Sequence, residues 1–169
     1  MGNAVGMRAY VVVFLSSLLL WILLTGSVET EELGAGLLVA SVVSAASGPH
    51  LAVLNGLKLN PAVPLYILNY LVYFFIALVR ANLDMARRIL SPSLPINPGV
   101  VEVETSLESP LGRMLLANSI TLTPGTLTVD LKEDRLLIHW INVPEGIDVA
   151  TATRHIAAGF EQRISGFLK

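Results

Sequence analysis

The sequence predicts a helical membrane half followed by a small α+β domain. Hydrophobic residues make up 53% of the 169 residues and charged residues only 14%, with a mean hydropathy of +0.67. A soluble domain usually has about 25% charged residues, so the composition is unlike that of an ordinary soluble protein. Most charges also come after Arg80. We therefore divide the chain into a membrane-embedded region 1–90, a linker 91–99 and a soluble domain 100–169.

The first apolar segment, residues 9–26, carries no charge and has nearly the length of about 20 residues that spans a bilayer. A signal peptide is the alternative, because Arg8 precedes the apolar run. The run is long for a signal peptide, and a second apolar segment follows directly. We expect a retained transmembrane helix.

The second apolar segment, residues 33–53, follows the acidic link 29–32 and is rich in small residues. Gly36, Ala40 and Ser44 are spaced four apart and therefore share one helix face. Small residues at this spacing let helix backbones approach closely in lipid. This face packs against the first segment or a partner subunit, unless the helix is simply rich in Ala and Ser.

The third apolar segment begins at Asn60-Pro61, which we interpret as an N-cap followed by the first helical position. It stays apolar up to Val79, and the helical pattern continues to Leu90. We expect this extension to leave the bilayer and run along the headgroup region. Three apolar helices are thus predicted in the N-terminal half.

The domain after residue 100 alternates between strand and helix patterns. Residues 101–106 have the period of two that is typical of a strand. Ser109-Pro110 starts a short helix, residues 126–131 and 136–143 form a hairpin around a polar loop, and Asp148 caps a final helix. The order β-α-β-β-α resembles a ferredoxin-like fold without its last strand. With about 70 residues, this domain is expected to lean on a partner or on the membrane.

The basic residues near the apolar segments predict the side of the membrane on which the domain lies. Three spans place the two termini on opposite sides. Arg80, Arg87 and Arg88 would then lie on one side, and Arg8 and Lys58 on the other. Basic residues favour the cytoplasm, so the count of three to two predicts a cytoplasmic C-terminal domain.

The charged residues after the third apolar segment are candidates for the membrane interface. Asp84, next to Asn82, would be a candidate for an ion or proton pathway if it were buried in the membrane. We favour the alternative, a surface salt bridge to Arg87 or Arg88. Together with Arg80, these arginines are expected to contact lipid phosphates.

The sequence offers no signature of a catalytic, cofactor or metal site. It contains no cysteine, which excludes disulfides, thiolate metal sites and ligation of iron–sulfur clusters by this chain. His50, His139 and His155 lack the spacing of a metal site. No Ser-His-Asp set or glycine-rich nucleotide loop can be assembled, so we expect no enzyme. The net charge of −2 gives no reason to expect binding of nucleic acid.

The polar run 118–130 contains five hydroxyl side chains in its Ser and Thr positions up to Thr128, and the tetrapeptide Thr123-Pro124-Gly125-Thr126. Proline and glycine in the two central positions favour a type II turn. The hydroxyls could form hydrogen bonds to a neighbouring chain. Ordinary turn chemistry and strand propensity explain the same residues equally well, so the residues alone leave both interpretations open.

Three motifs together resemble the E-type chain of the multisubunit Na⁺/H⁺ antiporters, the Mrp or Mnh family. They are Ala81-Asn82-Leu83-Asp84 with the basic residues after it, the linker Pro95 to Gly99, and the run Leu116 to Asp130. The third motif is long enough to be specific. The resemblance favours a docking role for the polar run, and the candidate residues for a subunit interface or structural motif are Asn118, Thr121, Thr123, Pro124, Gly125, Thr126 and Asp130.

The resemblance implies an accessory subunit of a cation/proton antiporter complex in the cell membrane, whose partners are other subunits and the bilayer. Such a complex exchanges cytoplasmic Na⁺ or another monovalent cation for external H⁺. The same type of subunit also occurs in membrane-bound hydrogenases and ferredoxin-dependent complexes. A freestanding membrane adaptor is a third alternative.

Overall fold

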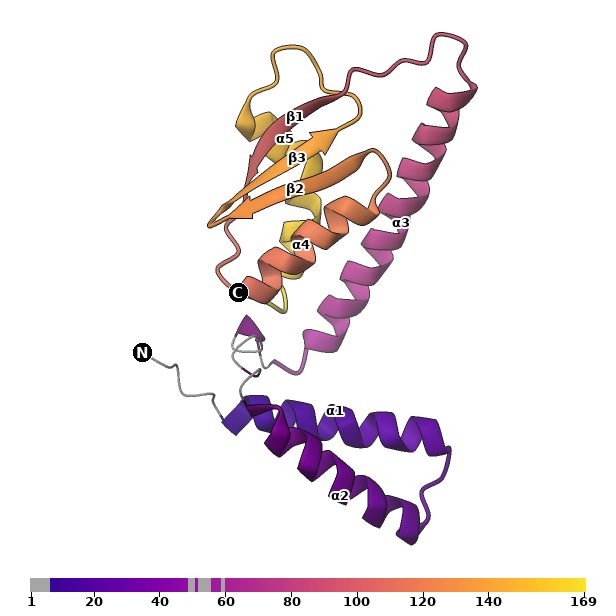
Figure 1. The fold of residues 1–169 in the computed structure, drawn as a ribbon, viewed down its shortest axis with the longest axis vertical. Coiled ribbons are helices and arrows are strands. Elements are labelled where there is room, and N and C mark those ends of the chain that lie inside the picture. The colour runs from indigo at the N-terminus through magenta and orange to yellow at the C-terminus, as the bar shows by residue number, and fades with distance from the viewer. Residues whose placement is uncertain (1–6, 49–50, 52–55, 59) are drawn as a thin grey trace. The chain divides into compact units, whose positions relative to one another are not determined.

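The computed structural model describes residues 7–48, 51, 56–58 and 60–169. Contacts divide the chain into two compact units, Met1–Asn55 and Gly56–Lys169. The helical hairpin belongs to the first unit, and the third helix and the sheet belong to the second (Figure 1).

The first unit is a hairpin of two helices, α1 (Met7–Thr25) and α2 (Thr30–Ala46). The buried residues of α2 are Gly36, Ala40 and Ser44, which confirms the predicted packing face and identifies α1 as its partner. Close approach of the backbones allows two long-range hydrogen bonds. The Ser44 hydroxyl donates to the Tyr10 carbonyl at 2.9 Å, and the Trp21 indole N–H donates to the Glu32 carbonyl at 3.1 Å.

The outer surface of this hairpin is apolar. A contiguous apolar surface of this extent marks a contact with lipid or with another protein, because water would otherwise hydrate it at a cost in free energy. The large side chains that are exposed on α1 and α2 include Val11, Leu15, Leu19, Leu20, Leu23, Leu24, Leu37, Leu38, Val42 and Val43.

The second unit begins with a single long helix, α3 (Val63–Leu90), at the place of the third apolar segment and its extension. The predicted start at Asn60-Pro61 is wrong by two residues. Asn60 instead accepts a hydrogen bond from the Ala62 N–H at 3.0 Å, and Pro64 occupies the first turn. Among the described helices, α3 is the longest apolar one, with 28 residues; the apolar part of α1, Ala9–Thr25, is shorter but within the range of lengths that can span a bilayer.

A sheet of three antiparallel strands follows, in the order β1-β3-β2. The strands are β1 (Gly99–Glu104), β2 (Thr126–Lys132) and β3 (Arg135–Trp140). The first two run parallel to each other, because each pairs antiparallel with β3 between them. The predicted second hairpin strand extends too far, since β3 ends at Trp140.

Three short helices accompany the sheet: α4 (Pro110–Leu122), α5 (Val149–Ile156) and α6 (Ala158–Ile164). Asp148 caps α5 as predicted, and α4 begins at the predicted Ser109-Pro110, where the Ser109 side chain caps it. The two side chains accept from the N–H groups of Thr151 and Gly112 at 2.7 and 3.1 Å. Hydrogen bonds from Thr151 also hold the pKa of Asp148 below its ordinary value. We predicted a single final helix, but the structure has two, because the helix is interrupted at Ala157.

One core joins the inner face of the sheet to the helices. Strand alternation directs Val101, Val103, Leu136 and Ile138 inward, where they share one core with buried side chains of α4, α5 and α6. The same core includes Tyr70 of α3, which is 8% exposed. The small domain therefore leans on the third helix of its own chain, where the sequence led us to expect a partner or the membrane.

Tyr70 also makes a polar contact in this core. Its hydroxyl lies 2.8 Å from the Ser119 hydroxyl of α4. Ser119 already donates its one hydrogen to the Leu115 carbonyl at 2.6 Å, so Tyr70 is the donor in the shared bond. The bond fixes the rotation of α3 relative to α4.

We expect the substitution Tyr70→Phe to lower the free energy of unfolding of the second unit by about 1 kcal/mol, because the buried hydrogen bond is lost. Tyr66→Phe is the matched control on the same helix, since Tyr66 is 41% exposed. Chemical unfolding of the purified chain in detergent measures the free energy of unfolding of both variants. Equal losses in the two variants would contradict the assigned bond.

Candidate functional site

The most distinctive part of the sequence forms the corner between α4 and β2. Asn118 and Thr121 lie in the last turns of α4, and Thr123 to Thr126 form the turn into β2. The Thr126 N–H donates to the Thr123 carbonyl at 3.3 Å, and Gly125 has a φ of 96°. These two features agree with the predicted type II turn, which needs a positive φ at its third residue.

The threonine hydroxyls of this corner form hydrogen bonds within the chain. Thr123, Thr126 and Thr128 donate to the carbonyls of Ser119, Ile120 and Ala117, at 2.8, 2.7 and 3.1 Å. The Thr121 hydroxyl accepts from the Thr128 N–H at 3.1 Å.

Two of these bonds occupy the carbonyls of Ser119 and Ile120 in the last turn of α4, where the helix has no N–H group four positions further on to pair with them. Of the two interpretations that the sequence left open, the structural one accounts for the geometry of these hydroxyls. A contact of the same residues with another subunit stays a prediction.

Apolar side chains that the sequence analysis did not single out surround the corner. Leu122, Leu127 and Val129 are 62%, 49% and 57% exposed, and Asn118 in the last turns of α4 is exposed as well. Val129 lies at a bulge between Thr128 and Asp130, on an edge strand of the sheet (Figure 1). In the sequence, these apolar residues alternate with the threonines of the run 118–130, and this alternation could have indicated that they are exposed. We call Asn118, Leu122, Leu127 and Val129 the corner surface.

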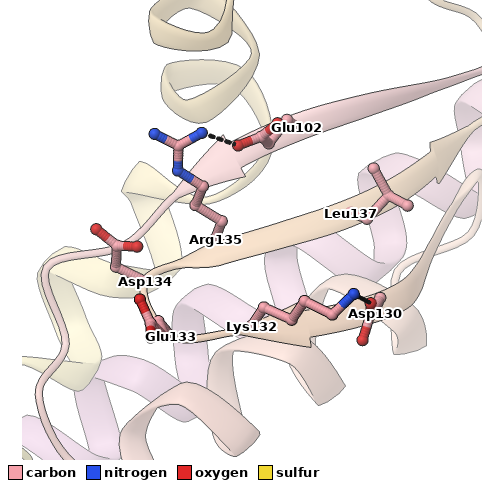
Figure 2. A pocket seen from close by; sticks show the side chains of 7 residues that line it. All are labelled: Glu102, Asp130, Lys132, Glu133, Asp134, Arg135 and Leu137. Carbon is pink, nitrogen blue, oxygen red and sulfur yellow. Dashed lines mark hydrogen bonds and ion pairs between the residues drawn. The ribbon is translucent and has the colours of Figure 1, made fainter.

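Asp130 lies beyond the corner, in a hollow of about 550 Å³ on the outer face of the sheet (Figure 2). The charges of this hollow are largely paired: Lys132 lies 2.9 Å from Asp130, and Arg135 lies 2.7 Å from Glu102. The hydrogen bond from Lys132, assisted by the Leu131 N–H, holds the pKa of Asp130 below its ordinary value. Glu102 likewise raises the pKa of Arg135. Glu133 and Asp134 also line the hollow, so its lining has four acidic and two basic side chains and is net negative.

The charged residues at the end of α3 lie on the surface. Asp84 and Arg88 form an ion pair at 2.7 Å, and the carboxylate side chain is 58% exposed. Arg88 also donates to the Pro95 carbonyl at 2.7 Å, which ties the end of the helix to the linker. Asn82 donates to the Leu78 carbonyl, while Arg80 and Arg87 are exposed. The geometry agrees with the surface salt bridge that we favoured, with Arg88 as the partner.

The described part of the chain contains no group of three or more His, Asp or Glu side chains that could hold a metal ion. His50 lies outside the described residues. His155 packs near Trp140, with ring centroids 6.3 Å apart, and His139 is exposed on the outer face of the sheet.

Comparison with known proteins identifies relatives of this chain. The sequence model of a family described as Na⁺/H⁺ ion antiporter subunit, MNHE, matches residues 14–166. The E-type chain of the Na⁺/H⁺ antiporter from Alkalihalophilus pseudofirmus is 42% identical over 80 residues, which are 46% of this chain and 51% of that protein. The E1-type chain of the antiporter from Staphylococcus haemolyticus is 40% identical over 73 residues, which are 43% of this chain and 46% of that protein.

A solved structure is similar over a longer range. A chain of the membrane-bound sulfane sulfur reductase, described as an archaeal respiratory membrane complex, is 39% identical with a TM-score of 0.76. The match covers 92% of this chain and 96% of that one. By contrast, the chain matches only about half the length of the two antiporter proteins above.

We expect Gly125→Val to destabilise the second unit by at least about 1–2 kcal/mol, because a β-branched residue resists a positive φ. A Cβ atom there would also lie 3.2 Å from Cγ2 of Ile141. Gly146→Val separates the two causes: Gly146 also has a positive φ, 67°, but no atom lies within 4 Å of an added Cβ, so this variant should lose less stability than Gly125→Val. Unfolding in detergent and the yield of assembled complex are the measurements. Normal values for both in the Gly125 variant would refute the role of the turn.

Proposed function

Because the chain belongs to the family of Na⁺/H⁺ ion antiporter subunits of the MnhE type, we propose that it is an accessory subunit of a multisubunit cation/proton antiporter complex in the cell membrane. The observation that carries this proposal is the family match over residues 14–166, which includes most of the helical hairpin, α3 and the α+β domain. The cation is Na⁺ or another monovalent ion, exchanged for protons.

The exposed surfaces support a role in assembly. The hairpin of α1 and α2 and the corner surface both expose apolar side chains that need a cover. The apolar core of the first segment, residues 9–26, carries no charge. Ion transport through a membrane depends on ionisable residues inside it, so other subunits of the complex supply the ion pathway in this proposal.

Two finer features belong to the same proposal. The small domain is a ferredoxin-like fold without its last strand, supported by the strand order β1-β3-β2 and by the element order β-α-β-β-α-α, in which α5 and α6 take the place of the one predicted helix. The domain lies on the cytoplasmic side, supported by the arginines that follow the apolar part of α3. This chain acts in transport and not as an enzyme.

A second candidate function follows from the similarity to the sulfane sulfur reductase chain. In this alternative, the chain is the corresponding subunit of a membrane-bound respiratory oxidoreductase that contains an antiporter-like module. The fold and the surfaces of the chain would be the same in both hosts, so the partners decide between them.

Purification in mild detergent through a C-terminal tag, with identification of the co-purifying chains by mass spectrometry, tests the proposed function. We expect large multi-span antiporter-like subunits without redox proteins. Co-purifying nickel–iron or iron–sulfur subunits would instead assign the chain to a respiratory complex. A small particle that contains only this chain would contradict both.

The corner surface is tested by Val129→Lys, which we expect to lower the recovery of partner subunits at least about tenfold, because a charge would be buried in an apolar contact. Val100→Lys is the matched control: Val100 is also a strand valine that is 57% exposed, but it lies on β1. Both variants should unfold like the parent chain. Equal recovery in the two would contradict docking at the corner.

We expect Asp84→Asn to leave antiport nearly unchanged, because exposed ion pairs contribute little and Arg88 keeps its bond to Pro95. Sodium-dependent proton movement in inverted membrane vesicles is the measurement. Loss of antiport in a normally assembled complex would place Asp84 in the ion pathway.

A further inference from the structure

The two long faces of α3 have different surroundings. One face packs on the domain over the first half of the helix, from Val63 through Tyr70 and Phe74 to Ala77. Further along, Met85 lies against Gly125, whose added Cβ would be 3.4 Å from the Met85 methyl group. From Val63 to Met85 the contact is roughly 33 Å long, at a rise of about 1.5 Å per residue.

This packing includes polar and charged groups of the domain. The Tyr70 hydroxyl bonds to Ser119, and the Arg163 guanidinium lies 3.7 Å from the centroid of the Tyr73 ring. The hydrocarbon core of a bilayer is about 30 Å thick, nearly the length of the contact. A spanning α3 would therefore carry the domain into the hydrocarbon, together with its charges and the open edges of its sheet, which lipid cannot accommodate.

The opposite face of α3 is a continuous apolar stripe. Its members recur at intervals of three, four or seven residues, so they lie along one side of the helix. The stripe consists of Leu65, Leu68, Val72, Phe75, Val79, Leu83 and Leu90, which are between 42% and 82% exposed. Arg80 and Arg87 lie seven residues apart along one flank of the stripe, and both are exposed.

We propose that α3 lies in the plane of the membrane and does not cross it. The stripe is sunk at the boundary between headgroups and acyl chains, the domain sits on the aqueous side, and Arg80 and Arg87 contact the phosphates of anionic lipids. This inference rests on the membrane location proposed above. Lipid is the occupant because an apolar stripe with a cationic flank matches an anionic bilayer surface.

The topology of the chain follows from this arrangement. If only α1 and α2 span the membrane, the N-terminus, Lys58 and the domain lie on the same side. The five basic residues Arg8, Lys58, Arg80, Arg87 and Arg88 are then all cytoplasmic, whereas three spans divide them three to two. The acidic link 29–32 lies outside. The rule that basic residues stay inside is thus better satisfied by two spans than by the three that the hydropathy suggested.

Single cysteines can test this directly, because the chain has none of its own. Nitroxide labels at Leu68, Phe75, Val79 and Leu83, in the full chain in phosphatidylcholine–phosphatidylglycerol vesicles, report depth through relaxation by oxygen and by a water-soluble nickel chelate. We expect one shallow depth, equal within about one helical pitch of 5 Å. Leu15 of α1 is the control and should be deep.

A depth that changes steadily along these four positions, by on the order of 20 Å, would show a spanning helix and overturn the proposal. Labels that neither reagent reaches would show a protein partner on the stripe, which would also overturn it. A deep label at Leu15 shows that the chain is inserted in the membrane, so these outcomes cannot be confused with a failure of insertion.

Labelling in intact cells tests the topology independently. Ser27→Cys lies in the link between α1 and α2, and Ser93→Cys lies in the linker after α3. We expect a membrane-impermeant maleimide to label Ser27→Cys alone, and both after permeabilisation. Reaction of both or of neither in intact cells would overturn the two-span arrangement. The result does not depend on which subunits co-purify, so the proposed function can fail while this inference holds.

Discussion

The packing of α3 on the helices of the small domain is the contact on which the rest of the second unit depends. A sheet of three strands with three short helices buries little apolar surface, and such a domain is marginal alone. Tyr70 and Phe74 extend this core, and the rings of Phe160 and Phe167 from the C-terminal part of the chain meet them with centroids 5.8 to 6.3 Å apart. The hydrogen bond between Tyr70 and Ser119 sets the rotation of the helix.

That rotation has a consequence for function, because it determines which side of α3 remains exposed. The domain covers the side of Tyr70 and Phe74, so the stripe from Leu65 to Leu90 faces outward. A mean hydropathy averages over both sides and therefore cannot separate a spanning helix from one that is covered by protein on one side. In the second unit, the apolar character of the helix serves a core and an outer contact at the same time.

The corner between α4 and β2 shows how a family-specific motif can be structural. Its threonines occupy carbonyls of the preceding helix, and Gly125 provides the positive φ that the turn requires. These bonds fix the direction in which β2 leaves the helix. They also hold Leu122, Leu127 and Val129 outward, so the polar residues build the corner and the apolar residues between them are available to a partner.

The sequence by itself determined the features that depend on neighbouring residues: the helical segments, the caps at Ser109 and Asp148, the turn at Pro124-Gly125 and the order of strands and helices. Periodicity and capping are local, so a single chain displays them. The family-specific run also pointed to an antiporter subunit, because its length makes chance similarity improbable.

Only the tertiary structure decided which groups meet. Ser119 bonds to a tyrosine 49 positions away, and Glu102 meets Arg135 across the sheet. Arg87 and Arg88 both lie at helical spacing from Asp84. The ion pair forms with Arg88, which also donates to the Pro95 carbonyl. Such choices depend on burial and register, which arise when distant segments pack and which no local pattern contains.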